Sequence, residues 1–203
     1  MTDTTAPGPE TTHSGVSRKA VVDAALKCFR QLGPHKTSMS DIAREAGISR
    51  KTLYRMFEDR PALVNQVLFQ LLRGMGSKSA GAVAKYSDVK EALIEGSIEN
   101  IRIAQEEELF QAIILNETST QMEHFLVQGN DAVRAEIVKI WAPVFERGRA
   151  EGTLRNDLSD ERLAEIIQNV HSLVLMRKDE TESAQRAFLE DLLWAALTNQ
   201  SGS

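Results

Sequence analysis

Apolar side chains recur every three or four residues from Ser17 almost to the C-terminus, and this spacing is the strongest constraint on the fold. Such a period places apolar groups along one face of an α-helix, whereas a half-buried strand would alternate apolar and polar residues. No stretch alternates convincingly with period two, and no Asn-Gly or Asp-Gly pair marks a hairpin. The sequence therefore predicts an all-α fold.

The breaks between helical segments divide the chain into parts of different character. Residues 1–16 are rich in Thr, Pro, Gly and Ser, and we expect them to form a disordered tail. Residues 17–60 hold three short segments, which predict a three-helix DNA-binding domain of the helix-turn-helix type. Residues 61–203 hold longer amphipathic segments, which predict a larger C-terminal helical domain.

Charge is unevenly distributed between these parts. Residues 17–60 carry ten basic and five acidic side chains, a net charge of +5, whereas the remainder carries 14 basic and 24 acidic ones, a net charge of −10. A cationic head on an acidic body indicates that only the head contacts a polyanion. The overall charge of −5 is therefore compatible with DNA binding.

Cysteine content and hydropathy bear on the compartment. The single cysteine, Cys28, permits neither an intramolecular disulfide nor a cysteine-based zinc site, as is typical of a reducing cytosol. No apolar run approaches the roughly 20 residues that a membrane span needs, and the N-terminal residues lack the apolar core of a secretory signal. We expect a cytoplasmic protein without a membrane partner, a metal or a cofactor.

The segment 37–57 has the pattern of two short helices joined by a tight turn. Ser38 and Asp41 have the spacing of a capping box, with the acidic residue in the usual place of Glu or Gln. Gly47 is suited to the turn, Ile48 to the core, and Ser49 to the N-cap of the second helix. This arrangement predicts a helix-turn-helix.

The second of these helices has two contrasting faces. At 100° per residue, Leu53, Met56 and Phe57 fall on one side, while Lys51, Tyr54 and Arg55 fall on the other. Lysine and arginine can read guanine in the major groove or neutralise phosphates, and a tyrosine hydroxyl commonly binds phosphate. A solvated basic face is the alternative interpretation of the same pattern.

Residues 17–73 resemble the DNA-binding domain of the TetR family of bacterial transcriptional regulators. The resemblance rests on the Thr-Ser-x-x-Asp-Ile-Ala run from Thr37, the Gly-Ile-Ser turn, Thr52-Leu53-Tyr54, Phe57, Arg60 and Leu63. It implies that Tyr54 and Arg60 contact phosphates, although the family's usual residue at position 60 is lysine and Pro61 removes one amide N–H. The DNA-binding residues we predict are Lys36, Thr37, Ser38, Ser49, Arg50, Lys51, Thr52, Tyr54, Arg55 and Arg60.

The C-terminal part resembles the family's effector-binding and dimerisation domain only in outline. The resemblance implies a homodimer formed through the last two helices. Apolar stripes on these two helices independently indicate a four-helix interface. The interface residues we predict are Ile166, Ile167, Val170, Val174, Leu189, Leu192, Leu193 and Ala196.

Bulky apolar residues between Leu109 and Phe145 are more numerous than packing of one short and one broken helix requires. Aromatic and methionine side chains suit an apolar ligand, although aromatic residues at helical spacing more often form core, and His171 is more often structural than ligand-binding. The effector-binding residues we predict are Phe110, Ile114, Asn116, Met122, Phe125, Trp141, Phe145 and His171.

These patterns predict a dimeric transcriptional regulator, a repressor that leaves a palindromic double-stranded operator when a small, mainly apolar effector binds. The rival hypothesis is an enzyme, or a ligand-carrying helical bundle whose DNA-binding head has lost its function. The sequence shows no nucleophile–base pairing, no glycine-rich phosphate loop and no metal cluster, which weighs against an enzyme.

Overall fold

The computed structural model describes residues 15–116, 131–177 and 181–199, apart from the side chains of Leu115 and Asn116. The chain forms two compact units, Met1–Val67 and Leu68–Ser203. Helices account for most of the described residues, where no strand forms and a single isolated bridge joins Leu154 to Thr198. The predicted all-α fold is confirmed.

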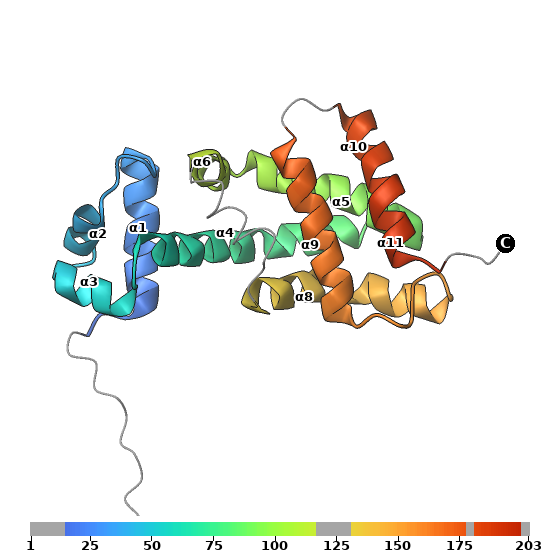
Figure 1. The fold of residues 1–203 in the computed structure, drawn as a ribbon, viewed down its shortest axis with the longest axis horizontal. Helices are drawn as coiled ribbons and strands as arrows, with labels where there is room; N and C mark the ends of the chain where they lie inside the picture. The colour runs from blue at the N-terminus through green and yellow to red at the C-terminus, as the bar shows by residue number, and fades with distance from the viewer. Residues whose placement is uncertain (1–14, 117–130, 178–180, 200–203) are drawn as a thin grey trace, which may run out of the picture. The chain divides into compact units, whose positions relative to one another are not determined.

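The N-terminal unit contains α1 (Arg18–Leu32), α2 (Met39–Glu45), α3 (Arg50–Met56) and the first residues of α4 (Arg60–Val83) (Figure 1). Serine hydroxyls cap the first three helices. Each of the four helices turns its apolar stripe inward and buries it. The most deeply buried residues of the unit are Val21, Ala25, Phe29, Ile42, Ala43, Leu53, Phe57, Leu63 and Val67.

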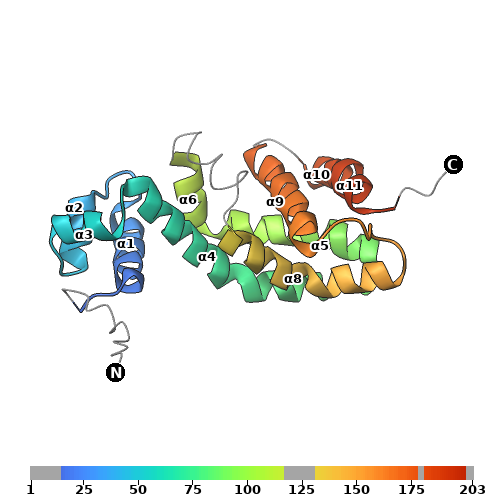
Figure 2. The same ribbon diagram turned by 60° about the horizontal axis from the view of Figure 1, so that its bottom comes forward.

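In its described residues, the C-terminal unit contains the rest of α4 and six further α-helices with one π-helical turn. They are α5 (Val89–Glu106), α6 (Glu108–Asn116), α8 (Asp131–Ala150), α9 (Asp160–Met176), α10 (Glu182–Leu189), the π-helix η2 (Glu190–Trp194) and α11 (Ala195–Leu197). Helices α5 and α8 run alongside each other, and α9 packs against both (Figures 1 and 2). The succession α10–η2–α11 packs on α5 and α9.

Close packing at a glycine fixes the end of α8. A Cβ atom on Gly148 would lie 2.5 Å from Cγ of Leu154, so only glycine fits beside the turn that follows the helix. The helix continues through Pro143, which lies inside it without ending it. The chain beyond α11 is held to the same turn, since the Asn199 side chain donates to the carbonyls of Gly152 and Leu154 at 2.9 and 3.0 Å.

In the part of the chain that the structure describes, no helix is both long and apolar enough to cross a membrane.

Candidate functional site

The predicted capping box at the start of α2 is present. The Ser38 hydroxyl accepts from the Asp41 amide at 3.2 Å, and the Asp41 carboxylate accepts from the Ser38 amide at 3.0 Å. The hydroxyl and amide of Ser38, followed by the guanidinium of Arg44, hold the pKa of the Asp41 carboxyl below its ordinary value. This reciprocal cap fixes where α2 begins.

The turn between α2 and α3 has the conformation that its sequence predicts. Gly47 has φ of +66°, a left-handed conformation that glycine adopts without strain. The Ile48 amide donates to the Ala43 carbonyl at 2.9 Å, and the Ser49 hydroxyl caps α3 by accepting from the Thr52 amide at 3.1 Å. The turn therefore sets the angle at which α3 leaves α2.

Helix α3 presents a polar surface opposite its buried side. Leu53 and the C-cap residue Phe57 are buried, whereas Lys51 and Arg55 are exposed and Tyr54 is 43% exposed. The guanidinium of Arg50 lies 6.0 Å from the Tyr54 ring centroid, so these two side chains share one surface. We call the exposed residues Arg50, Lys51, Tyr54 and Arg55 the α3 basic surface.

The cations of the α3 basic surface have no carboxylate partner among the described residues. Elsewhere in the same unit, Lys19 pairs with Asp23 at 2.7 Å and Arg44 pairs with Asp41 at 2.6 Å. No described Asp or Glu lies within ion-pair distance of Arg50, Lys51 or Arg55. The positive charge of the α3 basic surface, on the helix that follows the turn, is therefore not neutralised by a described carboxylate.

Two residues predicted to contact DNA have partners within the fold. The Thr37 side chain is 3% exposed and its hydroxyl donates to the carbonyl of Gly33 at 2.8 Å, so that hydroxyl does not lie on the surface where DNA would bind. The hydroxyl satisfies a carbonyl at the end of α1, which is a structural role. The half-buried Arg60 donates to the Pro34 carbonyl at 2.9 Å and lies over the Phe29 ring.

The remaining predicted DNA-contact residues lie in the same unit and differ in how many of their polar groups already bond within the protein. Lys36 is exposed in the loop before α2. Ser38 and Ser49 are exposed but serve as N-caps, and the half-buried Thr52 places its hydroxyl 3.0 Å from that of Ser49. The sequence interpretation missed Arg18, which donates to the Met56 carbonyl and covers the Phe57 ring at 4.4 Å.

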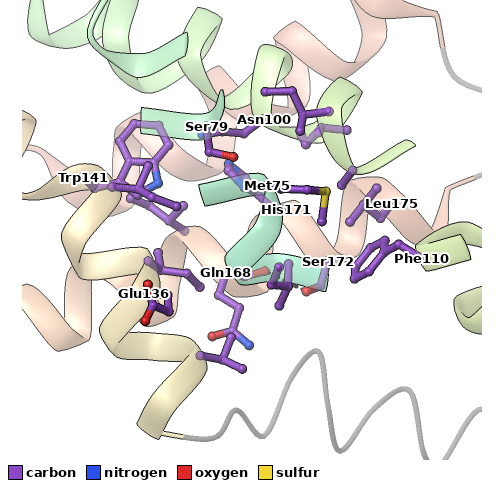
Figure 3. A pocket seen from close by; sticks show the side chains of 18 residues that line it. Met75, Ser79, Asn100, Phe110, Glu136, Trp141, Gln168, His171, Ser172 and Leu175 are labelled. Atoms are coloured by element: carbon purple, nitrogen blue, oxygen red, sulfur yellow. Dashed lines mark hydrogen bonds between the residues drawn. The ribbon is translucent and has the colours of Figure 1, made fainter. Parts of the chain in front are cut away.

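The C-terminal unit contains a partly open cavity of about 120 Å³ between α4, α5, α6, α8 and α9 (Figure 3). This volume corresponds to about four water molecules, at the roughly 30 Å³ that each occupies in the liquid. Most of the lining is aliphatic or aromatic, which is typical of a small-molecule site. The lining residues are Leu72, Met75, Ser79, Asn100, Ile101, Ile103, Ala104, Phe110, Val133, Glu136, Ile137, Ile140, Trp141, Ile167, Gln168, His171, Ser172 and Leu175.

The predicted effector residues separate into those that line this cavity and those that do not. Phe110, Trp141 and His171 line it. Phe145 is wholly buried in the core between α5, α8 and α9 and does not reach the cavity, so its prediction as a lining residue is wrong. Ile114 is half-buried outside the lining. Met122, Phe125 and the side chain of Asn116 lie outside the described parts of the structure.

The cavity wall contains six polar residues, which are Ser79, Asn100, Glu136, Gln168, His171 and Ser172, and the surroundings of three of them bear on ligand binding. Burial lowers the pKa of His171 to about 4, so its imidazole is neutral at physiological pH, and its ring meets Trp141 edge-on at 6.2 Å between centroids. Nε2 of His171 and Oδ1 of Asn100 are buried and have no hydrogen-bond partner within the described structure. Glu136 pairs with Lys139 at 2.9 Å and with Arg73 at 3.8 Å.

The predicted dimer residues lie mostly inside the protomer. Five of the eight are buried in the core of the C-terminal unit, and their assignment to an interface is wrong because their side chains already pack against other helices of the same chain. These five are Ile167, Val170, Val174, Leu189 and Leu193. Leu192 is 41% exposed, and Ile166 and Ala196 are half-buried. Leu173 and Met176, which the prediction omitted, are 46% and 55% exposed.

Within residues 15–116, 131–177 and 181–199, no three or more His, Cys, Asp or Glu side chains are arranged so that they could hold a metal ion.

Comparison with known proteins agrees with the two-unit architecture. Residues 21–67 match the family model of bacterial regulatory proteins, tetR family. The transcriptional repressor KstR2 of Rhodococcus jostii is 26% identical over 76% of this chain and 76% of its own length.

Solved structures of TetR-family repressors share the fold over nearly the whole chain. The transcriptional repressor QsdR of R. erythropolis superposes with a TM-score of 0.65 at 19% identity, covering 92% of this chain and 97% of that one. The repressor FadR of Thermus thermophilus, solved in complex with lauroyl-CoA, gives 0.59 at 23% identity, covering 92% and 98%. These relatives are transcriptional regulators by name. This chain shares the fold of the solved ones, and its residues 21–67 match the family model of bacterial regulatory proteins, tetR family.

Proposed function

We propose that this protein is a transcriptional regulator of the TetR family, which represses transcription by binding a palindromic double-stranded operator through the α3 basic surface. The observation that carries the proposal is the set of three exposed cations, Arg50, Lys51 and Arg55, without carboxylate partners among the described residues. Phosphate neutralisation supplies much of the affinity of DNA-binding proteins, and it needs cations that are not already paired. The name of KstR2 as a repressor supports the direction of regulation.

The residues of α3 have separable roles in this proposal. Lys51, Arg50 and Arg55 can donate to guanine O6 and N7 or to phosphates, because their side chains are exposed. The Tyr54 hydroxyl donates to a phosphate, which positions the helix without reading sequence. Since this target is chromosomal DNA, we place the protein in the bacterial cytoplasm.

We further propose that the regulator acts as a homodimer through an apolar outer face of its C-terminal unit. Leu173 and Met176 on α9 and Leu192 on η2 are large apolar side chains that a monomer leaves exposed. Two copies would satisfy a palindrome, because a two-fold dimer presents two identical α3 helices.

Oligomeric state gives a direct test of this face. The double variant Leu173→Glu/Leu192→Glu should sediment as a monomer and lose operator binding, since each head alone makes too few phosphate contacts. The matched control is Leu32→Glu, which alters a leucine of similar exposure, 47%, in the N-terminal unit. A double variant that remains dimeric would contradict the assignment.

We propose that a small, mainly apolar effector binds the cavity of the C-terminal unit and releases the operator. The largely apolar lining and the volume of about 120 Å³ support this role. The lauroyl-CoA complex of T. thermophilus FadR is a precedent for a related fold that holds a ligand with an apolar chain. The effector can shift the protein only by its differential affinity for the DNA-binding and released forms.

The experiment that tests operator binding uses fluorescence anisotropy with duplexes that tile the DNA upstream of the protein's own gene. We expect one duplex to bind at least about 1,000-fold more tightly than a scrambled duplex of equal length, as specific sites do. Lys51→Ala should reduce that ratio, because it removes a base contact. Equal affinity for every duplex would contradict specific repression and favour the bundle with an inactive head.

A further inference from the structure

The cavity of the C-terminal unit contains hydrogen-bonding atoms that its own walls leave unsatisfied. Oδ1 of Asn100 on α5 and Nε2 of His171 on α9 are buried, line the cavity and have no partner within the described structure. An unsatisfied buried polar atom is unfavourable, so such atoms are uncommon unless a bound molecule or water completes them. Figure 3 shows both residues among otherwise largely apolar side chains of the lining.

The two atoms differ in what they require. A carboxamide oxygen only accepts hydrogen bonds, so Asn100 Oδ1 needs a donor. The neutral imidazole of His171 can offer either an N–H or a lone pair at Nε2, according to its tautomer. A hydroxyl group donates and accepts and can satisfy either atom, whereas an ether or ketone oxygen has no proton to donate to Asn100.

Formal charge in the described lining is confined to one residue, and that residue is negative. Glu136 carries the charge, and its carboxylate already pairs with Lys139 and Arg73. Neither lysine nor arginine is among the described residues that line the cavity. The neutral His171 offers no compensating positive charge, so a carboxylate or phosphate buried here would have no counter-ion.

We infer that the cavity selects an uncharged, mainly apolar molecule that carries a hydroxyl group, and that Asn100 and His171 recognise that hydroxyl. This inference rests on the proposed function, because it names the chemical class of the effector. A cavity of about 150 Å³ holds benzene, so this slightly smaller and partly open volume fits the hydroxyl end of such a molecule, about five or six non-hydrogen atoms.

Isomeric probes separate hydroxyl recognition from simple apolar burial. 1-Octanol and methyl heptyl ether have the same atoms, but only the alcohol has a donor, and octanoate at pH 8 adds a full negative charge. Binding is measured without DNA, by the fluorescence of Trp141 in a Trp194→Phe background. The chain has two tryptophans, so this background leaves only the one that lines the cavity. We expect 1-octanol to bind about fivefold more tightly than the ether and octanoate to bind at least about tenfold more weakly than 1-octanol.

Substitution at Asn100 tests the recognition directly. Asn100→Leu keeps a similar shape and removes the acceptor, so 1-octanol and the ether should then bind within about twofold of each other. The control is Ser97→Ala, which removes another buried hydroxyl of α5 that has no partner in the described structure and lies outside the cavity lining. This control should keep the fivefold preference.

His171→Phe keeps an aromatic ring and removes both nitrogens. We expect it to weaken 1-octanol binding by about fivefold while leaving ether binding within about twofold. Equal binding of the two isomers to the parent protein, octanoate binding as tight as that of 1-octanol, or a preference that survives in both Asn100→Leu and His171→Phe would each overturn the inference.

Operator release is measured separately and distinguishes the two proposals. If 1-octanol binds with the expected selectivity but leaves the operator complex intact, hydroxyl recognition stands and the proposed effector response fails for this probe class. If an anionic amphiphile bound in the cavity releases the operator and 1-octanol does not bind, the response stands and hydroxyl recognition is wrong.

Discussion

The α3 basic surface and the cavity wall of the C-terminal unit carry polar groups under opposite conditions. On α3, three cations are exposed to water, where leaving a charge without a partner costs little. In the cavity, Asn100 and His171 present buried polar atoms without partners among the described residues, where the same omission is costly. Both surfaces therefore leave polar groups without partners in the chain by itself, but only the buried atoms of the cavity lower the stability of the folded protein.

The comparison shows how each surface selects its partner. Exposed cations attract any polyanion, so specificity on α3 must come from the geometry of a few side chains in a groove. Buried atoms without partners discriminate more strongly between ligands. A ligand that forms no hydrogen bond with them leaves their desolvation penalty in place and therefore binds more weakly. The N-terminal unit is therefore suited to a long charged partner, and the cavity to a small molecule with one well-placed polar group.

The largest expected effect is a loss of folding stability at acid pH, caused by His171 in the cavity wall. The unfolded chain takes up a proton at His171 near its ordinary pKa of 6.5, whereas the folded protein does so only at a pKa of about 4. Between these values the unfolded state binds more protons, so stability falls as the pH falls from about 7 to about 4, by at most about 3 kcal/mol.

Urea denaturation at pH 7.5 and pH 5.0 measures this loss for the parent and His171→Phe. The variant should lose distinctly less stability between the two pH values, because it lacks the group that titrates. An identical loss in both proteins would mean that other groups cause the acid sensitivity.

A pair of glycine substitutions compares packing in the two units. Gly148→Ala should destabilise the C-terminal unit by about 1–3 kcal/mol, because its Cβ would overlap Leu154. Gly47→Ala meets nothing within 4 Å and should cost about 1 kcal/mol, which arises from its φ of +66° alone. Thermal unfolding followed by circular dichroism checks both values, and equal costs would contradict the packing argument at Gly148.

The smallest expected effect is at the edge of the α3 basic surface. Tyr54→Phe removes one hydroxyl from an exposed ring, so stability should stay within about 0.5 kcal/mol of the parent. Operator affinity should fall about fivefold and by a similar factor for scrambled duplexes, because a phosphate contact carries no sequence information. Anisotropy titrations of both duplexes measure this, and a loss confined to the operator would assign Tyr54 to base recognition instead.

Local sequence patterns predict the helix-turn-helix well. The cap formed by Ser38 and Asp41, the positive φ at Gly47 and the cap at Ser49 all depend on residues within four positions of one another. Thr37 shows the limit of such inference. Its hydroxyl binds a carbonyl four residues earlier, and no spacing rule distinguishes that partner from DNA.

The cavity and the outer face of α9 depend on packing between distant segments. Asn100 lies in an unremarkable stretch of α5, and it becomes a candidate only because four other helices meet beside it. On α9, one side of the helix is buried at Ile167 and Val174, while the opposite side leaves Leu173 exposed. A continuous apolar pattern does not reveal which side the protomer itself covers, so the predicted dimer residues fell mainly in the core.

The most direct test of DNA recognition by α3 is the salt dependence of operator binding for the parent and the triple variant Arg50→Ala/Lys51→Ala/Arg55→Ala. The account predicts a steep fall of affinity with salt for the parent, and for the variant an affinity at least about 100-fold lower, with a slope shallower by about 0.9 for each phosphate contact removed. Lys19→Ala, which removes a cation already paired with Asp23, should change little. Parent-like affinity and slope in a folded triple variant would contradict the account.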